Sequence, residues 1–287
     1  MRKVIAIFTL ILLFIGSLSL AKTYAAEEQP SVIPTDWEDE YSPLSFQVQI
    51  LPWDMVKILL PNRSYFTIID VETGLSFRVQ RRAGSRHADV QPLTIKDTAI
   101  MKQIYGGKWS WNRRAILVMS KDRLIAASMS GMPHGSGALK NGFHGHFCVH
   151  FAGSRTHRSM SLDFAHQIMV LKAAGKLDEF ISIANPKEII QLLIVAINHH
   201  DEKLLKQIVA KYESYENFLK YVSTIERIKI DRFNEMETRG GLVLLETTVK
   251  ANIIYQGNIN EKRTIPFMIT RDSLTDQWKI EPSSFLP

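Results

Sequence analysis

The fold of the first domain is decided by the stretch Tyr65-Phe66-Thr67-Ile68-Ile69-Asp70, which Glu72-Thr73-Gly74 separates from Leu75-Ser76-Phe77-Arg78-Val79. Both runs are rich in β-branched and aromatic residues, and the segment between them contains a glycine, so the stretch predicts a β-hairpin. Three further apolar runs predict strands of the same domain, at residues 115–118, 124–129 and 147–151. The folded part of the chain therefore begins with a β-rich domain.

Two helices accompany these strands. Thr94 caps a helix predicted to run to Tyr105, because Asp97 stands at the capping-box position and Gly106 follows the last turn. A second helix is expected over residues 162–172, ending before Gly175. We place this domain at residues 45–175.

The sequence after residue 183 has a different order of elements. Asn185, Pro186 and Glu188 form the start of a helix, as N-cap, first helical residue and capping partner. Asp201 caps a second helix, and three strands are predicted to follow, at residues 248–255, 264–270 and 278–280. The chain is therefore expected to be α+β, with a second domain of helices followed by an antiparallel sheet at residues 183–287.

This second domain resembles the cone-shaped fold of the nuclear transport factor and ketosteroid isomerase class. The resemblance rests on the helices that come first and on a long-stranded sheet that ends on Trp278-Lys279-Ile280. It is architectural, so it implies a fold and no activity. We expect an accessory module.

The N-terminus predicts export. Residues 1–25 have the layout of a secretory signal peptide, with basic Arg2 and Lys3, an uncharged apolar run over residues 4–21 and alanines at the cleavage point. An uncleaved membrane anchor is the alternative, because the apolar run is close to the length that a membrane helix needs. Residues 26–44 contain six acidic residues, three prolines and no basic residue, which is typical of a tether. We expect an exported protein, extracellular or associated with the cell wall.

The positive charge is concentrated in the first domain. Residues 45–175 contain 17 Lys or Arg against 7 Asp or Glu, a net charge of +10, whereas residues 176–287 contain 15 against 16. Such a field attracts polyanions, and outside the cell these are wall polymers such as peptidoglycan, or lipid headgroups, and not nucleic acid. Membrane contact is expected only through an uncleaved N-terminal segment. A solvated basic surface is the alternative interpretation.

The only cysteine, Cys148, lies in the densest histidine cluster of the chain. Five of the 9 histidines fall within 24 residues, from His134 to His157. A cysteine attacks as the thiolate, and its pKa falls when a protonated histidine or an arginine stands nearby. With a base within reach, such a thiol performs acyl transfer. The cluster therefore predicts an activated thiol, with His134 and His146 as candidate bases.

His134-Gly135 and His146-x-Cys148 resemble the catalytic domain of the L,D-transpeptidases that remodel peptidoglycan. The pattern of that family is a His-Gly, a loop of somewhat over a dozen residues, and then Ser-His-Gly-Cys with an Arg or Asn two positions past the cysteine. The resemblance implies that Cys148 is the nucleophile, His134 its base and His146 a supporting donor, with no cofactor.

The chain departs from this pattern at three positions. Gly145 replaces the serine, Phe147 replaces the glycine before the nucleophile, and His150 stands in place of the Arg or Asn. A phenylalanine at residue 147 would obstruct a tight turn or an oxyanion hole. Several of the same stretches, together with His87-Ala88-Asp89, also resemble an uncharacterised domain of exported bacterial cell-wall proteins.

Two other interpretations of the cluster stay open. A zinc site is one: His144-x-His146 on a strand would point both rings to one face, and His87 and Asp89 would add ligands, as in a zinc-dependent wall peptidase. In the other, Cys148 is a small buried residue and the histidines are hydrogen-bonded loop residues. The protein would then be a non-catalytic wall-binding or developmental factor.

Basic and aromatic residues near the cluster are candidates for substrate binding. Arg113 and Arg114 suit the carboxylates of stem peptides, and Trp111 suits a sugar ring. His150 is a further candidate, and ordinary surface charge is the alternative for the arginines. The leading prediction is an exported enzyme that acts on peptidoglycan by cysteine acyl transfer.

Overall fold

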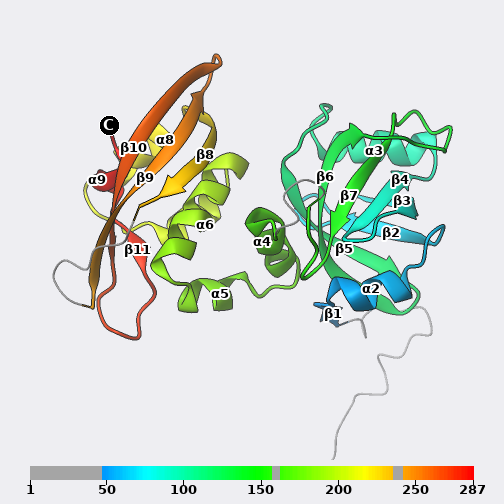
Figure 1. Cartoon of the computed structure of the whole chain (residues 1–287), viewed down its shortest axis with the longest axis horizontal. Coiled ribbons are helices and arrows are strands. Elements are labelled where there is room, and N and C mark those ends of the chain that lie inside the picture. The colour runs from blue at the N-terminus through cyan, green and yellow to red at the C-terminus, as the bar shows by residue number, and fades with distance from the viewer. Residues whose placement is uncertain (1–46, 157–161, 235–241) are drawn as a thin grey trace, which may run out of the picture. The chain divides into compact units, whose positions relative to one another are not determined.

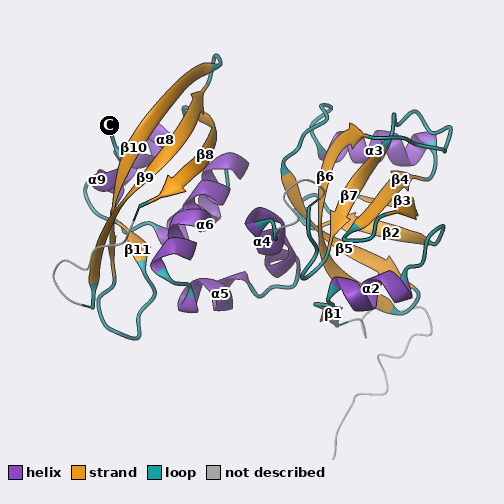
Figure 2. Ribbon diagram, in the orientation of Figure 1, coloured by secondary structure: helices purple, strands orange, loops and turns teal. Residues whose placement is uncertain are grey.

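A computed structural model describes residues 47–156, 162–234 and 242–287 and divides them between two domains (Figure 1). The N-terminal domain is a six-stranded antiparallel β-barrel, and the C-terminal domain consists of helices followed by a curled four-stranded antiparallel sheet (Figure 2). The α+β prediction is confirmed. The boundaries at 45–175 and 183–287 stay predictions.

The barrel is closed by pairing between its last two strands. Its strands are β2 (Tyr65–Asp70), β3 (Ser76–Ala83), β4 (Ala88–Pro92), β5 (Arg113–Ser120), β6 (Arg123–His134) and β7 (His146–His150). They follow the order β6-β5-β2-β3-β4-β7, and β7 also pairs with β6, which completes the ring. A short strand β1 (Val48–Gln49) adds to β6 in parallel. Closure removes free strand edges from the barrel.

The predicted hairpin is β2 and β3. Phe66, Ile68 and Asp70 are the buried positions of β2, so the strand shows the alternation expected of one buried face. Gly74 has a φ of +69°, a conformation that glycine adopts without strain, and its N–H donates to the carbonyl of Asp70. The turn residues therefore set the register in which Ile68 faces Phe77.

Three helices accompany the barrel: α2 (Trp53–Leu59), α3 (Ile95–Ile104) and α4 (Phe164–Ala173). The capping box of Thr94 and Asp97 is confirmed for α3, and the carboxylate of Asp97 also accepts from the N–H of Arg78 on β3. Helix α4 packs against β5 and β6. Its N-cap is Asp163, whose side chain accepts from the N–H of His166.

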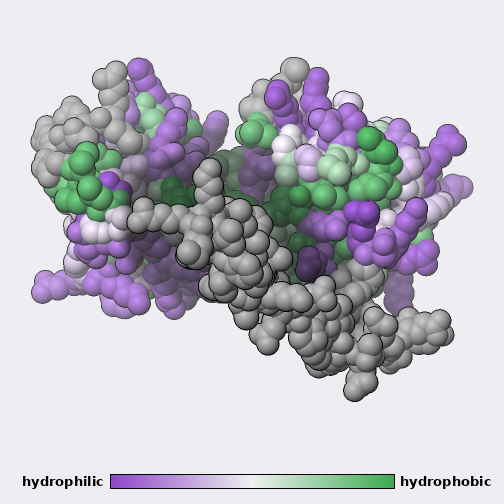
Figure 3. Space-filling view, turned by 90° about the horizontal axis from the view of Figure 1, so that it is seen from below, coloured by the Kyte–Doolittle hydropathy of each residue, from purple (hydrophilic) through white to green (hydrophobic). Residues whose placement is uncertain are grey.

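The sequence did not predict α2, whose outer side is apolar. Met55, Ile58 and Leu59 are exposed there, and Ile58 keeps 75% of its surface in solvent. Figure 3 views the barrel domain from the side on which α2 lies and shows hydrophobic residues beside hydrophilic ones on the visible part of that face. Helix α2 therefore buries one face, through Trp53 and Val56, and leaves the other open.

The C-terminal domain follows the predicted order of elements. Its helices are α5 (Leu177–Ile183), α6 (Pro186–His199), α7 (Glu202–Ile208) and α8 (Tyr215–Val222), and a short α9 (Pro282–Phe285) ends the chain. Its sheet has the order β11-β10-β9-β8, formed by Lys279–Ile280, Ile259–Thr270, Leu244–Tyr255 and Ile225–Phe233. The predicted capping box of Asn185 and Glu188 is present in α6, and Asp201 caps α7.

The expected signal peptide at residues 1–25 and tether at 26–44 lie outside the described residues. Among the helices that the structure describes, none is long and apolar enough to cross a membrane.

Candidate functional site

A cavity of about 630 Å³ opens in the barrel domain beside the cysteine. Ten residues line it: His87, Trp111, Arg113, Ser130, His134, Cys148, His150, Thr156, Asp163 and His166. They come from β5, β6 and β7, from the segments before β4 and before β5, from the segment after β7 and from the start of α4. The cavity therefore gathers residues that are up to 79 positions apart in the sequence.

Pairing between β6 and β7 positions the central residues. Cys148 faces Ser130 across the strands, and His134 faces His146, with an irregular register between these two pairs. Cys148 and His150 are two residues apart on β7, so both side chains point to the same face of the strand. The face of β7 that looks into the cavity thus carries the thiol of Cys148 and the imidazole of His150.

His134 is placed to act as a base toward Cys148. The thiol Sγ lies 3.2 Å from His134 Nε2, and His134 Nδ1 lies 2.9 Å from the carbonyl oxygen of Met132. The carbonyl can only accept, so Nδ1 carries the proton in the neutral ring and Nε2 presents its lone pair to the thiol. The Cys148 S–H therefore donates to His134.

This pair is neutral at rest. Burial, and secondarily the carboxylate of Asp89, raises the pKa of Cys148 to about 12. Burial also lowers the pKa of His134 below its ordinary value of 6.5. The expectation that nearby positive charge lowers the pKa of the cysteine is thus wrong, because burial dominates. The arrangement suits a base that removes the proton as the thiol attacks.

Phe147 does not obstruct the cavity. It is fully buried in the barrel core, with ring centroids 6.2 Å from Phe77 and 5.8 Å from Phe143. Adjacent residues of a strand point to opposite faces, so Phe147 points away from the thiol of Cys148. The departure from the transpeptidase pattern at this position fills the barrel and leaves the cavity open.

Two glycines allow the turn of His134 to lie against the start of β7. Gly145 has a φ of +99°, and a Cβ there would meet the carbonyl oxygen of His134 at 2.4 Å. Gly135 has a φ of +62°, and a Cβ there would meet the ring of His146 at 2.4 Å. A side chain at residue 145 would therefore displace the turn of His134, and a side chain at residue 135 would displace the ring of His146.

His146 packs against His134. Its ring packs edge-on against His134, with centroids 4.5 Å apart. Its Nδ1 lies 3.0 Å from the carbonyl oxygen of Ser136, and its Nε2 lies 3.8 Å from Asp89 Oδ1. The ring of His146 thus lies between His134 and Asp89 in reach of both.

Three imidazoles are stacked along one wall of the cavity. The ring centroid of His150 lies 4.5 Å from that of His87 and 3.8 Å from that of His166, with nearly parallel planes. His166 Nδ1 lies 2.8 Å from the hydroxyl of Ser128. Burial lowers the pKa of both His150 and His166 far below the ordinary value.

We expect these two histidines to make the protein sensitive to acid. They stay neutral in the folded state but bind protons near pH 6.5 when the chain unfolds, so the free energy of unfolding falls as pH drops below 6.5. Each contributes about 1.4 kcal/mol per pH unit, or about 2.7 kcal/mol together. Urea unfolding between pH 7.5 and 5.5 in EDTA measures this slope. Burial also lowers the pKa of His199 and of His134, so both add to the total slope. His166→Gln should therefore lower the slope by about 1.4 kcal/mol per pH unit; an equal slope in the wild type and in His166→Gln would contradict the assignment.

The predicted substrate-binding residues separate into two groups. Trp111, Arg113 and His150 line the cavity with Cys148, and the Trp111 ring lies 5.2 Å from that of His134. Arg113 binds Asp163 at 2.6 Å, so a substrate carboxylate would compete with Asp163 for this guanidinium.

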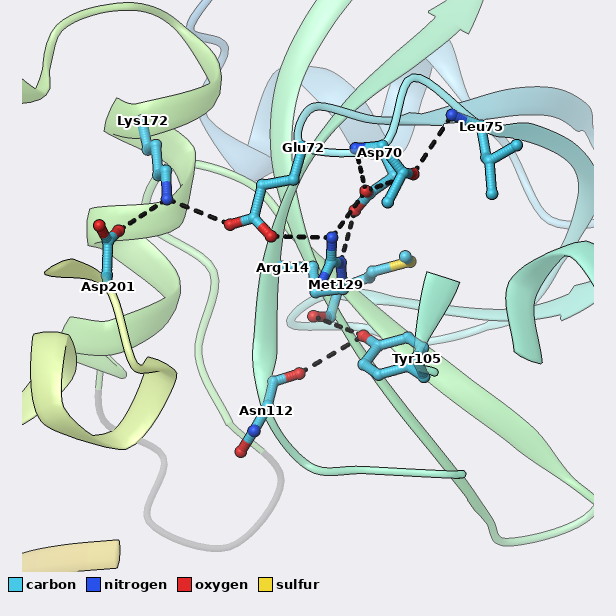
Figure 4. Close-up of polar contacts among 10 residues, drawn as sticks. Asp70, Glu72, Leu75, Tyr105, Asn112, Arg114, Met129, Lys172 and Asp201 are labelled. Atoms are coloured by element: carbon cyan, nitrogen blue, oxygen red, sulfur yellow. Dashed lines mark hydrogen bonds and ion pairs between the residues drawn. The ribbon is translucent and has the colours of Figure 1, made fainter. Parts of the chain in front are cut away.

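Arg114 is not part of the cavity wall. It follows Arg113 on β5 and therefore points to the other face, where its guanidinium binds Asp70 at 2.6 Å and Glu72 at 2.9 Å (Figure 4). Tyr105 lies nearby and donates to the carbonyl of Met129. In the structure Arg114 thus bridges Asp70 and Glu72, and its role in substrate binding stays a prediction.

The zinc ligands predicted from the sequence are not brought together as a set. His144 precedes β7 and is exposed, so His144 and His146 do not share a strand face. His87 Nε2 and Asp89 Oδ1 are 3.1 Å apart. The described residues instead place a different trio within ligand distance: His87, Cys148 and His150.

Four residues of the cavity wall were not predicted from the sequence: Ser130, Thr156, Asp163 and His166. The sequence offered one signal for them: His166 lies in an apolar run of the helix predicted at 162–172, and a histidine in such a run indicates a buried polar contact. His157, the last histidine of the cluster, lies outside the described residues. No protein-family model and no curated protein matches this chain.

Proposed function

We propose that the protein is an exported enzyme that transfers acyl groups of cell-wall peptides through Cys148. The observation that carries the proposal is the 3.2 Å contact between Cys148 Sγ and His134 Nε2 on the wall of a 630 Å³ cavity. The resemblance of His134-Gly135 and His146-x-Cys148 to the L,D-transpeptidase pattern supports the same chemistry.

The reaction has two balanced halves. His134 Nε2 takes the proton of Cys148 as the sulfur attacks an amide carbonyl, and the tetrahedral intermediate collapses when the leaving amine receives that proton. This leaves a thioester on Cys148. An acceptor amine, or water, then gives a proton to His134 and attacks the thioester, which releases the new amide or acid and restores the thiol.

Peptidoglycan is the proposed substrate because of charge and cavity chemistry. Stem peptides carry carboxylates, and the domain around the cavity has a net charge of +10 over residues 45–175. Trp111 is 44% exposed beside the catalytic pair and offers a surface for a sugar or peptide. We also propose that the C-terminal domain shares the cone architecture of the nuclear transport factor class; its curled four-stranded sheet and the helices before it support this.

Incubation of the purified protein with sacculi, followed by mass spectrometry of the released muropeptides, tests the function. We expect new cross-linked or trimmed stems that depend on the protein. Unchanged muropeptides across donor and acceptor stems would overturn the proposal.

His134→Gln should lower the rate of this reaction by about 10²- to 10⁴-fold, because it removes the base and keeps a side chain of similar size. The wild-type rate should fall in acid as His134 is protonated, with a midpoint below 6.5 because burial lowers the pKa of this histidine. Rates measured from pH 4.5 to 8 in EDTA check both effects. The acid limb should be absent in the variant; an unaltered limb would show that another group is the base.

A further inference from the structure

We propose that His87, Cys148 and His150 form a zinc-binding site on the wall of the same cavity, and that zinc bound there blocks the cysteine. One ligand atom from each of the three lies within 4.8 Å of the other two. All three side chains are buried. One thiolate and two imidazoles are a donor set that zinc prefers.

The fold fixes two of the ligands to one strand. Cys148 and His150 are two residues apart on β7, which puts both donors on the same face. His87 directly precedes β4. The first residue of β4, Ala88, pairs with Val149, which lies between Cys148 and His150 on β7. A tetrahedral zinc ion holds such donors about 3.3–3.7 Å apart, so closure by roughly 1 Å through side-chain rotation would complete the coordination.

His150 offers a donor atom for the metal. Its Nδ1 is buried without a hydrogen-bond partner among the described residues, although the side chain lines the cavity and is only 2% exposed. A buried polar atom without a partner is costly, and a metal ion would supply that partner.

The surroundings of His87 suit a metal ligand. Its Nδ1 lies 2.8 Å from the carbonyl oxygen of Arg155, and its Nε2 lies 3.1 Å from Asp89 Oδ1. A backbone carbonyl on the other ring nitrogen is the usual support of a histidine ligand.

His87, Cys148 and His150 all line the cavity, and three protein ligands would leave one position on the zinc ion for water or another small ligand. Zinc held by the Cys148 sulfur occupies the nucleophile. Inhibition by zinc rests on the proposed acyl transfer through Cys148. Binding of zinc to the three ligands does not depend on that function.

Titration of the untagged, metal-free protein with Co²⁺ tests the site. We expect one equivalent to bind with a thiolate-to-cobalt charge-transfer band, and Zn²⁺ to displace it. Cys148→Ser should abolish the band, and His150→Phe and His87→Gln should each weaken Zn²⁺ binding by at least about 100-fold. His144→Gln and His134→Gln are matched controls that should keep the site, and circular dichroism checks that each variant is folded.

Protection of the thiol provides a second readout. Stoichiometric Zn²⁺ should slow alkylation of Cys148 by N-ethylmaleimide in the wild type and not in folded His150→Phe. Absence of the cobalt band, or a Zn²⁺ affinity that His150→Phe leaves unchanged, would overturn the site. If zinc binds but the protein transfers no acyl groups, the proposed function is contradicted and the zinc site is retained. If stoichiometric Zn²⁺ leaves the rate of acyl transfer unaltered, only the proposed inhibition is overturned.

Discussion

Cys148→Ser should abolish acyl transfer to wall peptides, with a loss of at least about 10³-fold in rate. The hydroxyl is far less acidic and a weaker nucleophile than the thiol, and its shorter bond to Cβ moves it from the position of the sulfur, which lies 3.2 Å from His134 Nε2. The measurement is the initial rate of muropeptide conversion by wild type and variant at equal concentration.

The variant should remain folded, because serine fits the volume that Cys148 leaves and the cavity beside it provides room. Ser130 lies opposite Cys148 in the barrel, so Ser130→Ala is a control that alters the same wall and keeps the nucleophile. Retention of more than a tenth of the wild-type rate by folded Cys148→Ser would rule out this cysteine as the nucleophile.

Phe147→Ala should destabilise the protein by about 3–5 kcal/mol, because it removes a fully buried aromatic ring and leaves a void in the barrel. The truncation removes the packing of this ring against Phe77 and Phe143. Denaturant unfolding at pH 7.5 measures the change. Ile58→Ala is the matched control, since Ile58 is 75% exposed and its truncation should change stability by no more than about 0.5 kcal/mol.

This second result also distinguishes two explanations of the departure from the transpeptidase pattern. If Phe147 belonged to the cavity, its truncation would widen access to Cys148 and leave the barrel intact. A Phe147→Ala protein as stable as the wild type would contradict the placement of this ring in the core.

Local signals made much of the fold predictable. The β2–β3 hairpin and the capped starts of α3, α6 and α7 depend on residues within a few positions of each other, such as Thr94 with Asp97 and Asn185 with Glu188. Alternation in β9 was also visible in the sequence. The closure of the barrel was not, because no local pattern specifies that Cys148 pairs with Ser130 across β6 and β7.

The sequence indicated several residues of the site, but it did not indicate how their side chains are arranged in space. Spacing pointed to Cys148 and His134, and the structure places them in contact. The two arginines could not be separated, because the side that each faces depends on the register of β5. His144 was wrongly expected on a strand with His146, since the positive φ of Gly145 breaks the extended chain between them. His87 joins the cavity only through the pairing of β4 with β7.

The most direct test is to trap the acyl-enzyme. Wild-type protein is mixed with purified stem-peptide donor without acceptor, quenched in acid within seconds, and analysed by intact and peptide-level mass spectrometry. The account predicts an added acyl mass on the peptide that contains Cys148, formed much more slowly by His134→Gln and absent from Cys148→Ser. Conversion of the donor with no adduct on Cys148, or with an adduct on another residue, would contradict it.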